Sequence, residues 1–208
     1  MVSKTKKILI TSGPTWVAID DVRVISNVST GKMGEALVAA CRKKHFDVTL
    51  LEGPVLNVNT RKDIRVIKFK FYDELLSLLK KELTKNYDVV IHAAAVSDYK
   101  LKKPFKTKLS SHLEHLKLDL VPTQKMIHLI KKINPRVFLV GFKLEPKLNV
   151  GVLRQKTQDL FKNAHCDLVV ANSTNARHYC GYILHPSGKI LAHPMSRAGL
   201  AHALVKLL

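Results

Sequence analysis

Hydrophobic positions along the chain follow two alternating patterns. Short apolar runs rich in β-branched residues predict strands, which we place at 7–11, 47–51, 64–69, 88–92, 137–142 and 167–171. Longer segments carry apolar residues three and four positions apart and predict helices, at 31–44, 73–83, 124–132, 150–163 and 196–207. Strands that alternate with helices predict an α/β fold, with a Rossmann-like, mostly parallel sheet and helices on both faces.

Two regions depart from this alternation. Residues 100–121 combine charge, Pro104 and weak alternation of leucines, and we expect a flexible loop with a small hairpin there. Near the end of the chain, short strands at 182–185 and 189–192 flank a Pro-Ser-Gly turn and predict a second hairpin. The length of 208 residues fits a single domain over 1–208.

Composition excludes several classes of protein. A hydrophobic content of 46% is too high for a disordered chain, and three cysteines are too few for a disulfide scaffold. The apolar runs are far shorter than the roughly 20 residues that a membrane-spanning helix needs. We therefore expect a cytoplasmic protein with reduced thiols and no membrane partner.

The formal charge of +19 raises nucleic-acid binding as a possibility. The basic residues are spread along the chain, however, and aromatic residues make up only 6% of it, which is a poor supply for base stacking. We expect no nucleic-acid partner. A basic surface without specific function and a site for anionic, phosphorylated substrates both remain open.

Two loops at the expected carboxyl edge of the sheet carry candidate chemistry, because ligands bind at that edge in such folds. The first runs from Ser12-Gly13-Pro14 to a helix start near Gly31, where free backbone N–H groups suit phosphate. It matches neither a dinucleotide fingerprint nor a P-loop, and the same residues could simply cap and pack the helix. The second loop, AAAVSD (93–98), leaves room for a ligand beside the backbone, and Asp98 could contact that ligand or cap a helix.

The ten histidines do not form a metal-binding pattern. No pair has H-x-x-x-H spacing on an expected helix, and His112 and His115 lie in a loop. We predict no protein-bound metal site.

Five ordered motifs resemble one family. They are ISNVSTGKMG (25–34) with Arg23 upstream, AAAVSD (93–98), Lys106-Thr107-Lys108, GFKLE (141–145) and DLVVAN (167–172). Over residues 7–175 the chain resembles phosphopantothenoylcysteine synthetase, also called phosphopantothenate–cysteine ligase. The flavin-dependent decarboxylase half to which many bacterial members are fused is absent, so the resemblance implies a stand-alone form.

The resemblance implies an enzyme of coenzyme A biosynthesis. Members join 4′-phosphopantothenate to L-cysteine through an acyl-nucleotidylate and release pyrophosphate and a nucleoside monophosphate. It further implies a nucleoside triphosphate as co-substrate, with CTP favoured over ATP, together with Mg²⁺. A homodimer and a separate phosphopantothenoylcysteine decarboxylase are the implied protein partners.

Site residues carry over by motif position. The implied catalytic residues are Asn27 and Lys106. The implied substrate-binding residues are Arg23, which would reach the neighbouring subunit, Asn27, Ala94, Ala95 and Asp98. The implied nucleotide-binding residues are Gly13, Ser29, Gly31, Gly34, Asp98, Lys106, Phe142, Lys156, Lys162 and Asn172.

The chain also departs from the family pattern. Pro14 stands where a second glycine is common and removes one N–H donor. Residues 121–125 differ from the bacterial pattern, which leaves the choice between CTP and ATP open. A nicotinamide-dependent oxidoreductase on a similar sheet and a basic nucleic-acid-binding protein are the alternatives.

Overall fold

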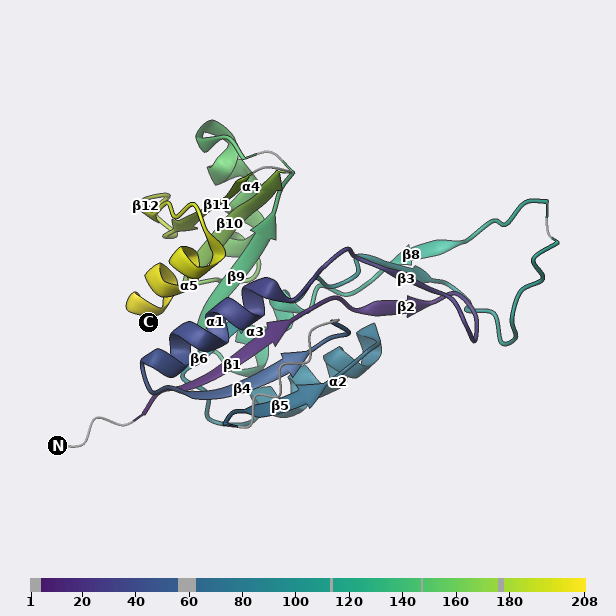
Figure 1. Cartoon of the computed structure of the whole chain (residues 1–208), viewed down its shortest axis with the longest axis horizontal. Helices are drawn as coiled ribbons and strands as arrows, with labels where there is room; N and C mark the ends of the chain where they lie inside the picture. Colours follow the sequence, from purple (N-terminus) through teal and green to yellow (C-terminus); the bar gives the residue numbers. More distant parts are fainter. Residues whose placement is uncertain (1–4, 56–62, 113, 147, 176–177) are drawn as a thin grey trace.

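The computed structural model describes residues 5–55, 63–112, 114–146, 148–175 and 178–208. Its centre is an eight-stranded sheet in the order β12-β11-β10-β9-β6-β1-β4-β5 (Figure 1). The strands of this sheet are β1 (Lys7–Ser12), β4 (Asp47–Glu52), β5 (Arg65–Lys68), β6 (Val89–His92), β9 (Phe138–Leu144), β10 (Leu168–Asn175), β11 (His178–Leu184) and β12 (Ile190–Ala192). Six of these strands are parallel: β10, β9, β6, β1, β4 and β5. β11 and β12 are antiparallel to their neighbours and lie at one edge.

The chain changes direction across the sheet at β1. From β1 it moves outward through β4 and β5, and then it crosses back so that β6 pairs with the other side of β1. The order of the strands therefore reverses at β1, and the loops after β1 and β6 lie at a topological switch point, where open α/β sheets bind ligands.

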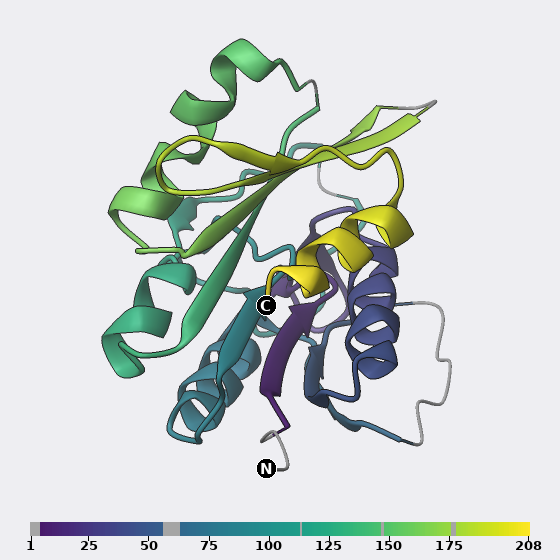
Figure 2. The same ribbon diagram turned by 90° about the vertical axis from the view of Figure 1, so that its left-hand side faces the viewer.

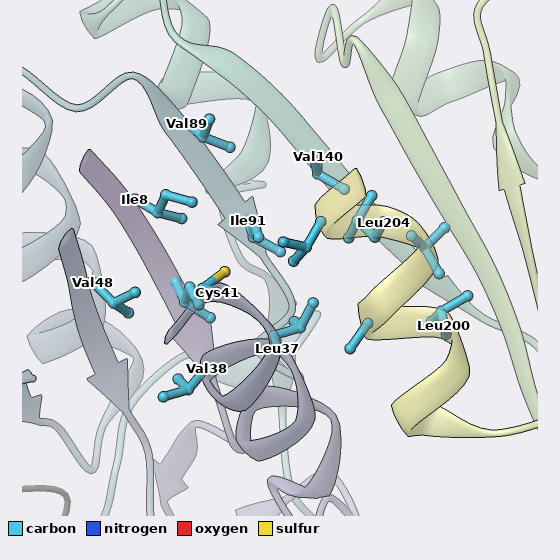
Figure 3. Close-up of a cluster of buried hydrophobic side chains, with 14 of the residues drawn as sticks. Ile8, Leu37, Val38, Cys41, Val48, Val89, Ile91, Val140, Leu200 and Leu204 are labelled. Carbon is cyan, nitrogen blue, oxygen red and sulfur yellow. The ribbon is translucent and has the colours of Figure 1, made fainter. Parts of the chain in front are cut away.

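Helices cover both faces of the sheet, which confirms the predicted fold class (Figure 2). They are α1 (Lys32–Lys43), α2 (Tyr72–Leu83), α3 (Ile127–Ile133), α4 (Val150–Lys162) and α5 (Arg197–Lys206). On one face α1 packs against α5, and their apolar side chains bury Ile8, Ile91 and Val140 of the sheet (Figure 3). On the other face α2, α3 and α4 cover a second apolar cluster around Leu9, Val90 and Leu139.

An arm projects from the carboxyl edge of the sheet (Figure 1). It consists of residues 16–26, with the antiparallel pair β2 (Trp16–Ala18) and β3 (Val24–Ser26), and of residues 99–112 and 114–122, with the antiparallel pair β7 (Tyr99–Leu101) and β8 (Leu120–Pro122). The second pair confirms the hairpin expected over 100–121. The first pair was not predicted.

Several boundaries differ from the prediction. The third helix begins at Ile127 rather than near 124, and β11 begins at His178 rather than at 182. Both β9 and β10 continue past the ends expected for them. Pairing between these two strands extends to Leu144 and Asn172, and β10 continues to Asn175 by pairing with β11. Within the described ranges, no helix has the length and apolar character to span a membrane.

Candidate active site

The loops after β1 and β6 remain paired beyond the ends of the two strands. The amide of Ala95 donates to the carbonyl oxygen of Gly13 at 2.9 Å. The amide of Thr15 in turn donates to the carbonyl oxygen of Ala95 at 3.2 Å. This pairing holds the three alanines of 93–95 beside the Gly13-Pro14 turn. The alanine-rich segment is thus a rigid wall with very small side chains, which leaves space in front of its backbone.

Asn27 joins the segment before α1 to the same wall. Its amide nitrogen Nδ2 lies 3.2 Å from the carbonyl oxygen of Ala95 and 3.1 Å from that of Val96. Because both amide hydrogens are directed at these carbonyl groups, the side chain offers its oxygen Oδ1 as an acceptor. A substrate N–H group is the partner that this oxygen suits.

Helix α1 starts very close to the end of β1. Gly31 is the N-cap residue, with a φ of 72° that favours glycine. A Cβ atom on Gly34 would lie only 2.0 Å from Oγ and 2.4 Å from Cβ of Ser12, so only glycine allows this approach. The close approach brings the free N–H groups of the first turn to the carboxyl edge of the sheet, where they suit an anion.

A cavity of roughly 640 Å³ opens at this edge. Most of the residues implied by the resemblance line it: Gly13, Asn27, Ser29, Gly31, Gly34, Ala94, Ala95, Asp98, Phe142 and Asn172. These residues come from the ends of β1, β6, β9 and β10 and from the start of α1. The structure thus brings together residues that are up to about 160 positions apart in the sequence.

A second cavity of about 210 Å³ adjoins the first and lies toward α3 and α4. The two share Ala94, Asp98 and Phe142 among their walls, and Lys156 lines the second one. Lys162, in contrast, lines a third cavity of about 300 Å³ beside the β11–β12 hairpin. The structure therefore separates Lys162 from the implied nucleotide-binding residues that line the two adjoining cavities.

The main cavity is lined by more positive than negative charge. Lys32, Lys143 and Arg197 are its basic lining residues, and Asp98 is its acidic one. The Asp98 carboxylate forms an ion pair of 2.5 Å with Lys125. This balance favours a polyanionic ligand. None of Lys32, Lys125, Lys143 and Arg197 was predicted as a site residue, although Lys32 and Lys143 lie within two of the motifs.

His92 is the last residue of β6 and lines the second cavity. Its Nδ1 atom lies 2.9 Å from the hydroxyl oxygen of Thr11 on the neighbouring strand β1. Burial lowers the pKa of the imidazole to about 4, because the charged form would lose its hydration. His92 is thus a neutral hydrogen-bonding residue at the junction of the two strands.

Arg23 lies on the arm, where a buried carboxylate holds it. Asp20 is 5% exposed, and its Oδ2 atom accepts from the Arg23 guanidinium at 2.6 Å and from the amide of Leu109 at 3.0 Å. Its Oδ1 atom accepts from the amides of Val22 and Arg23 at 2.9 and 2.8 Å. Asp20 therefore ties the turn between β2 and β3 to the other segment of the arm.

Lys106 lies between two attachments of that segment. On one side the amide of Phe105 donates to the carbonyl oxygen of Ile19 at 2.9 Å, and on the other side Leu109 is bound to Asp20. The Lys106 side chain is exposed and lies outside the lining of the main cavity. In this structure neither Arg23 nor Lys106 reaches the cavity of its own chain.

We expect the change Asp20→Asn to loosen the arm around Lys106. The neutral amide loses the charge-assisted hydrogen bonds, so hydrogen exchange at the amide of Leu109 should become about tenfold faster or more. Mass spectrometry of peptides covering 102–112 measures this rate. Asp119→Asn is the matched control, because Asp119 is an exposed arm carboxylate 3.9 Å from Lys102 and should have little effect. Equal exchange in both variants would contradict the anchoring role.

The same contact should depend on pH. The amide of Leu109 is the largest cause that lowers the pKa of Asp20 from 3.8 to about 2, against the opposing effect of burial. A lowered pKa means that the contribution to stability is complete above about pH 4 and is lost as the pH falls toward 2. The fluorescence of Trp16, the only tryptophan and part of β2, should report this loss in the wild type.

Comparison with known proteins decides the family. Residues 3–206 match the family described as "DNA/pantothenate metabolism flavoprotein C-terminal domain". The chain belongs to this family. A curated member, the coenzyme A biosynthesis bifunctional protein CoaBC of Thermococcus kodakarensis, is 37% identical over 177 residues, which cover 82% of this chain and 42% of that protein. The chain thus spans less than half the length of that relative.

Solved structures of the family share the whole architecture. The DNA/pantothenate metabolism flavoprotein from Streptococcus pneumoniae has a TM-score of 0.86 at 26% identity, with 98% of each chain covered. The C-terminal domain of a coenzyme A biosynthesis bifunctional protein CoaBC has a TM-score of 0.78 at 26% identity, covering 97% of this chain and 93% of that one. Both structures are thus similar to this chain over nearly its whole length.

Proposed function

We propose that the protein is a phosphopantothenate–cysteine ligase that joins 4′-phosphopantothenate to L-cysteine through an acyl-nucleotidylate. One observation carries the proposal: a single positively charged cavity gathers the motif residues from the ends of four strands and the start of α1. Membership of a family whose curated relatives act in coenzyme A biosynthesis supports it.

The two adjoining cavities suggest how a nucleoside triphosphate binds. The base and ribose occupy the smaller cavity, beside Phe142 and Lys156. The phosphates pass Ala94, which lines both cavities, and lie in the larger one, where the N–H groups of the first turn of α1 bind them. The α-phosphate then lies at the alanine-rich wall, close to Asn27.

Activation is an in-line displacement at the α-phosphorus. A carboxylate oxygen of 4′-phosphopantothenate forms the new P–O bond, and the bond to the bridging oxygen of the β-phosphate breaks, so pyrophosphate leaves. The cationic lining stabilises the negative charge that develops on the phosphates. The alanine side chains allow the acyl group to approach the backbone closely.

Coupling replaces the nucleotide by the amine of cysteine. The amine nitrogen forms a bond to the acyl carbon, the C–O bond to the phosphate breaks, and nucleoside monophosphate and a proton are released. We assign Asn27 Oδ1 as the acceptor that orients a substrate N–H group beside Ala95. Lys106 would supply positive charge at the reacting phosphate, which requires an arm that reaches the site.

Mg²⁺ would accompany the triphosphate. Asp98 gives the main cavity one carboxylate, which fits an ion that is held by substrate phosphates, retained waters and one or two carboxylates. The ion would neutralise charge on the phosphates. Among the described residues no group of three or more His, Cys, Asp or Glu side chains could hold a metal without substrate.

The arm supports a homodimer. Val22, Val24, Tyr99, Phe105 and Leu120 are large apolar side chains exposed on it. An exposed apolar surface of this kind marks an interaction site, and a second copy of the chain is the partner that would bring Arg23 and Lys106 to a cavity. A cytoplasmic location and a separate decarboxylase partner remain predictions.

A turnover assay tests the function. Pyrophosphate release should require both 4′-phosphopantothenate and a nucleoside triphosphate, and addition of L-cysteine should release nucleoside monophosphate as well. A panel of CTP, ATP, GTP and UTP identifies the preferred nucleotide, with CTP expected first. Folded protein that releases no pyrophosphate with any of them would overturn the proposal, and binding of NADH or NADPH would favour an oxidoreductase instead.

A further inference from the structure

Arg197 is a cavity residue that none of the five motifs contains. It is the first residue of α5, 25 positions after the last motif residue, and its half-buried side chain lines the main cavity. The other lining residues come from the ends of β1, β6, β9 and β10 and from the start of α1. The C-terminal helix therefore adds a permanent positive charge to a site built mainly by the first 172 residues.

Two contacts place the start of α5 against β11, and an N-cap within the helix fixes where it begins. The amide of Gly181 in β11 donates to the carbonyl oxygen of Pro194 at 3.0 Å. Ser196 is the N-cap residue, and its hydroxyl oxygen accepts from the amide of Gly199 at 3.0 Å. A Cβ atom on Gly181 would lie 2.9 Å from the Leu200 side chain, so glycine at this position allows α5 to approach the sheet.

Tyr179 determines where the guanidinium group points. The Arg197 Cζ atom lies 4.8 Å from the centre of the Tyr179 ring, in a cation–π contact. The hydroxyl group of the same tyrosine lies 3.5 Å from the sulfur of Met33, in the first turn of α1. Arg197 and the N-terminus of α1 thus belong to one wall of the cavity, joined by a single aromatic ring.

Stacking on an aromatic ring leaves the edge of a guanidinium group available. Arginine combines such stacking with N–H donors in a planar fork, which matches the geometry of phosphate oxygens. The neighbouring N–H groups of α1 favour the same kind of ligand. The two sets of donors are therefore suited to bind one polyanion together.

We propose that Arg197, held over Tyr179, binds the outer phosphates of the nucleoside triphosphate, which leave as pyrophosphate. This inference rests on the proposed function. In that arrangement the α-phosphate reacts at the wall of Ala94 and Ala95, after β6, while Arg197 lies on the side of β10 and β11. The phosphates that extend from the reacting one toward α1 and α5 are the β- and γ-phosphates.

Binding measurements on variants test the assignment. Calorimetric titration with CTP, ATP, CMP, AMP and inorganic pyrophosphate, in the presence of Mg²⁺, is carried out on the full chain. Arg197→Met should weaken binding of the preferred triphosphate and of pyrophosphate roughly 10- to 100-fold, because charge-assisted hydrogen bonds are lost. Binding of the corresponding monophosphate should change less than about threefold, since it lacks the outer phosphates.

Two further variants separate position from charge. Arg197→Lys keeps the charge but loses the planar fork, and an intermediate loss of triphosphate binding is expected. Lys206→Met removes a positive charge from the exposed other end of the same helix and should leave every dissociation constant unchanged. An unaltered thermal melting curve of Arg197→Met shows that the variant is folded.

The outcomes distinguish this inference from the proposed function. Wild-type protein that binds no nucleotide contradicts the proposed function itself. Triphosphate binding by the wild type that Arg197→Met leaves unchanged overturns the role of Arg197 alone. An equal loss of triphosphate and monophosphate binding also overturns it, because Arg197 would then act on a part that both nucleotides share.

Discussion

The variant Gly34→Ala is expected to lose catalytic efficiency, kcat/KM, by about 100-fold or more. Its new methyl group would overlap with Ser12 at the end of β1, where both Oγ and Cβ lie within 2.4 Å of the added atom. The start of α1 must move away from the sheet by a distance of the order of 1 Å, and a displacement of that size can cost about 100-fold in rate. Steady-state kinetics with 4′-phosphopantothenate and the preferred nucleotide measures the loss.

Two companion variants make this prediction specific. Ser12→Gly in the Gly34→Ala background removes the atoms that collide and should restore part of the activity. Gly151→Ala is the matched control, because a Cβ atom on Gly151, also near the start of a helix, would meet only Asn149 Oδ1 at an ordinary 3.5 Å. Full activity of Gly34→Ala, or no recovery with Ser12→Gly, would show that the close approach of α1 to β1 is not required.

A dimer that combines one Asn27→Ala chain with one Lys106→Ala chain is expected to be active, although each variant alone is inactive. Asn27→Ala and Lys106→Ala should each lower kcat by roughly 100-fold, the cost typical of losing one group that stabilises the transition state. Asn27 contacts the wall of its own cavity, whereas Lys106 lies on the arm. If the arm serves the partner's cavity, a dimer of one chain of each variant contains one site in which both residues are intact.

Two affinity tags allow this mixed dimer to be isolated after coexpression. About half of the wild-type activity is expected from it, because a symmetric dimer has two sites and one of them is complete. A dimer of two Asn27→Ala chains, purified in the same way with the same tags, is the control and should stay inactive. Activity of the mixed dimer at the level of its parents would show that Lys106 acts within its own chain.

The central strands were predictable because burial on both faces produces continuous apolar runs. Val89-Val90-Ile91 is an example, and all three side chains are buried in the sheet. The start of α1 was predictable as well, since Gly31 precedes a regular spacing of apolar residues. The main cavity then follows from chain topology, which brings the ends of β1 and β6 together.

The β2–β3 pair of the arm and the added cations were not predictable for two different reasons. β2 and β3 are only three residues long, and Val17 is their one buried side chain while Val24 is exposed, so the segment is too short for an alternating pattern to stand out. Lys125 and Arg197 resemble ordinary surface cations in the sequence. Their places beside Asp98 and Tyr179 depend on packing between distant segments, which residue spacing does not reveal.

The burial of His92, whose ring is hydrogen-bonded to Thr11, determines how this part of the protein responds to pH. An imidazole with a pKa of about 4 is neutral from mildly acidic to alkaline solution. The charge at the end of β6 therefore stays the same throughout that range. Any bell-shaped rate profile near neutrality would then report ionisations other than that of His92, such as those of the cysteine amine and the terminal phosphates. His92, although it is titratable and lies at the centre of the sheet, therefore does not change its charge in this range of pH.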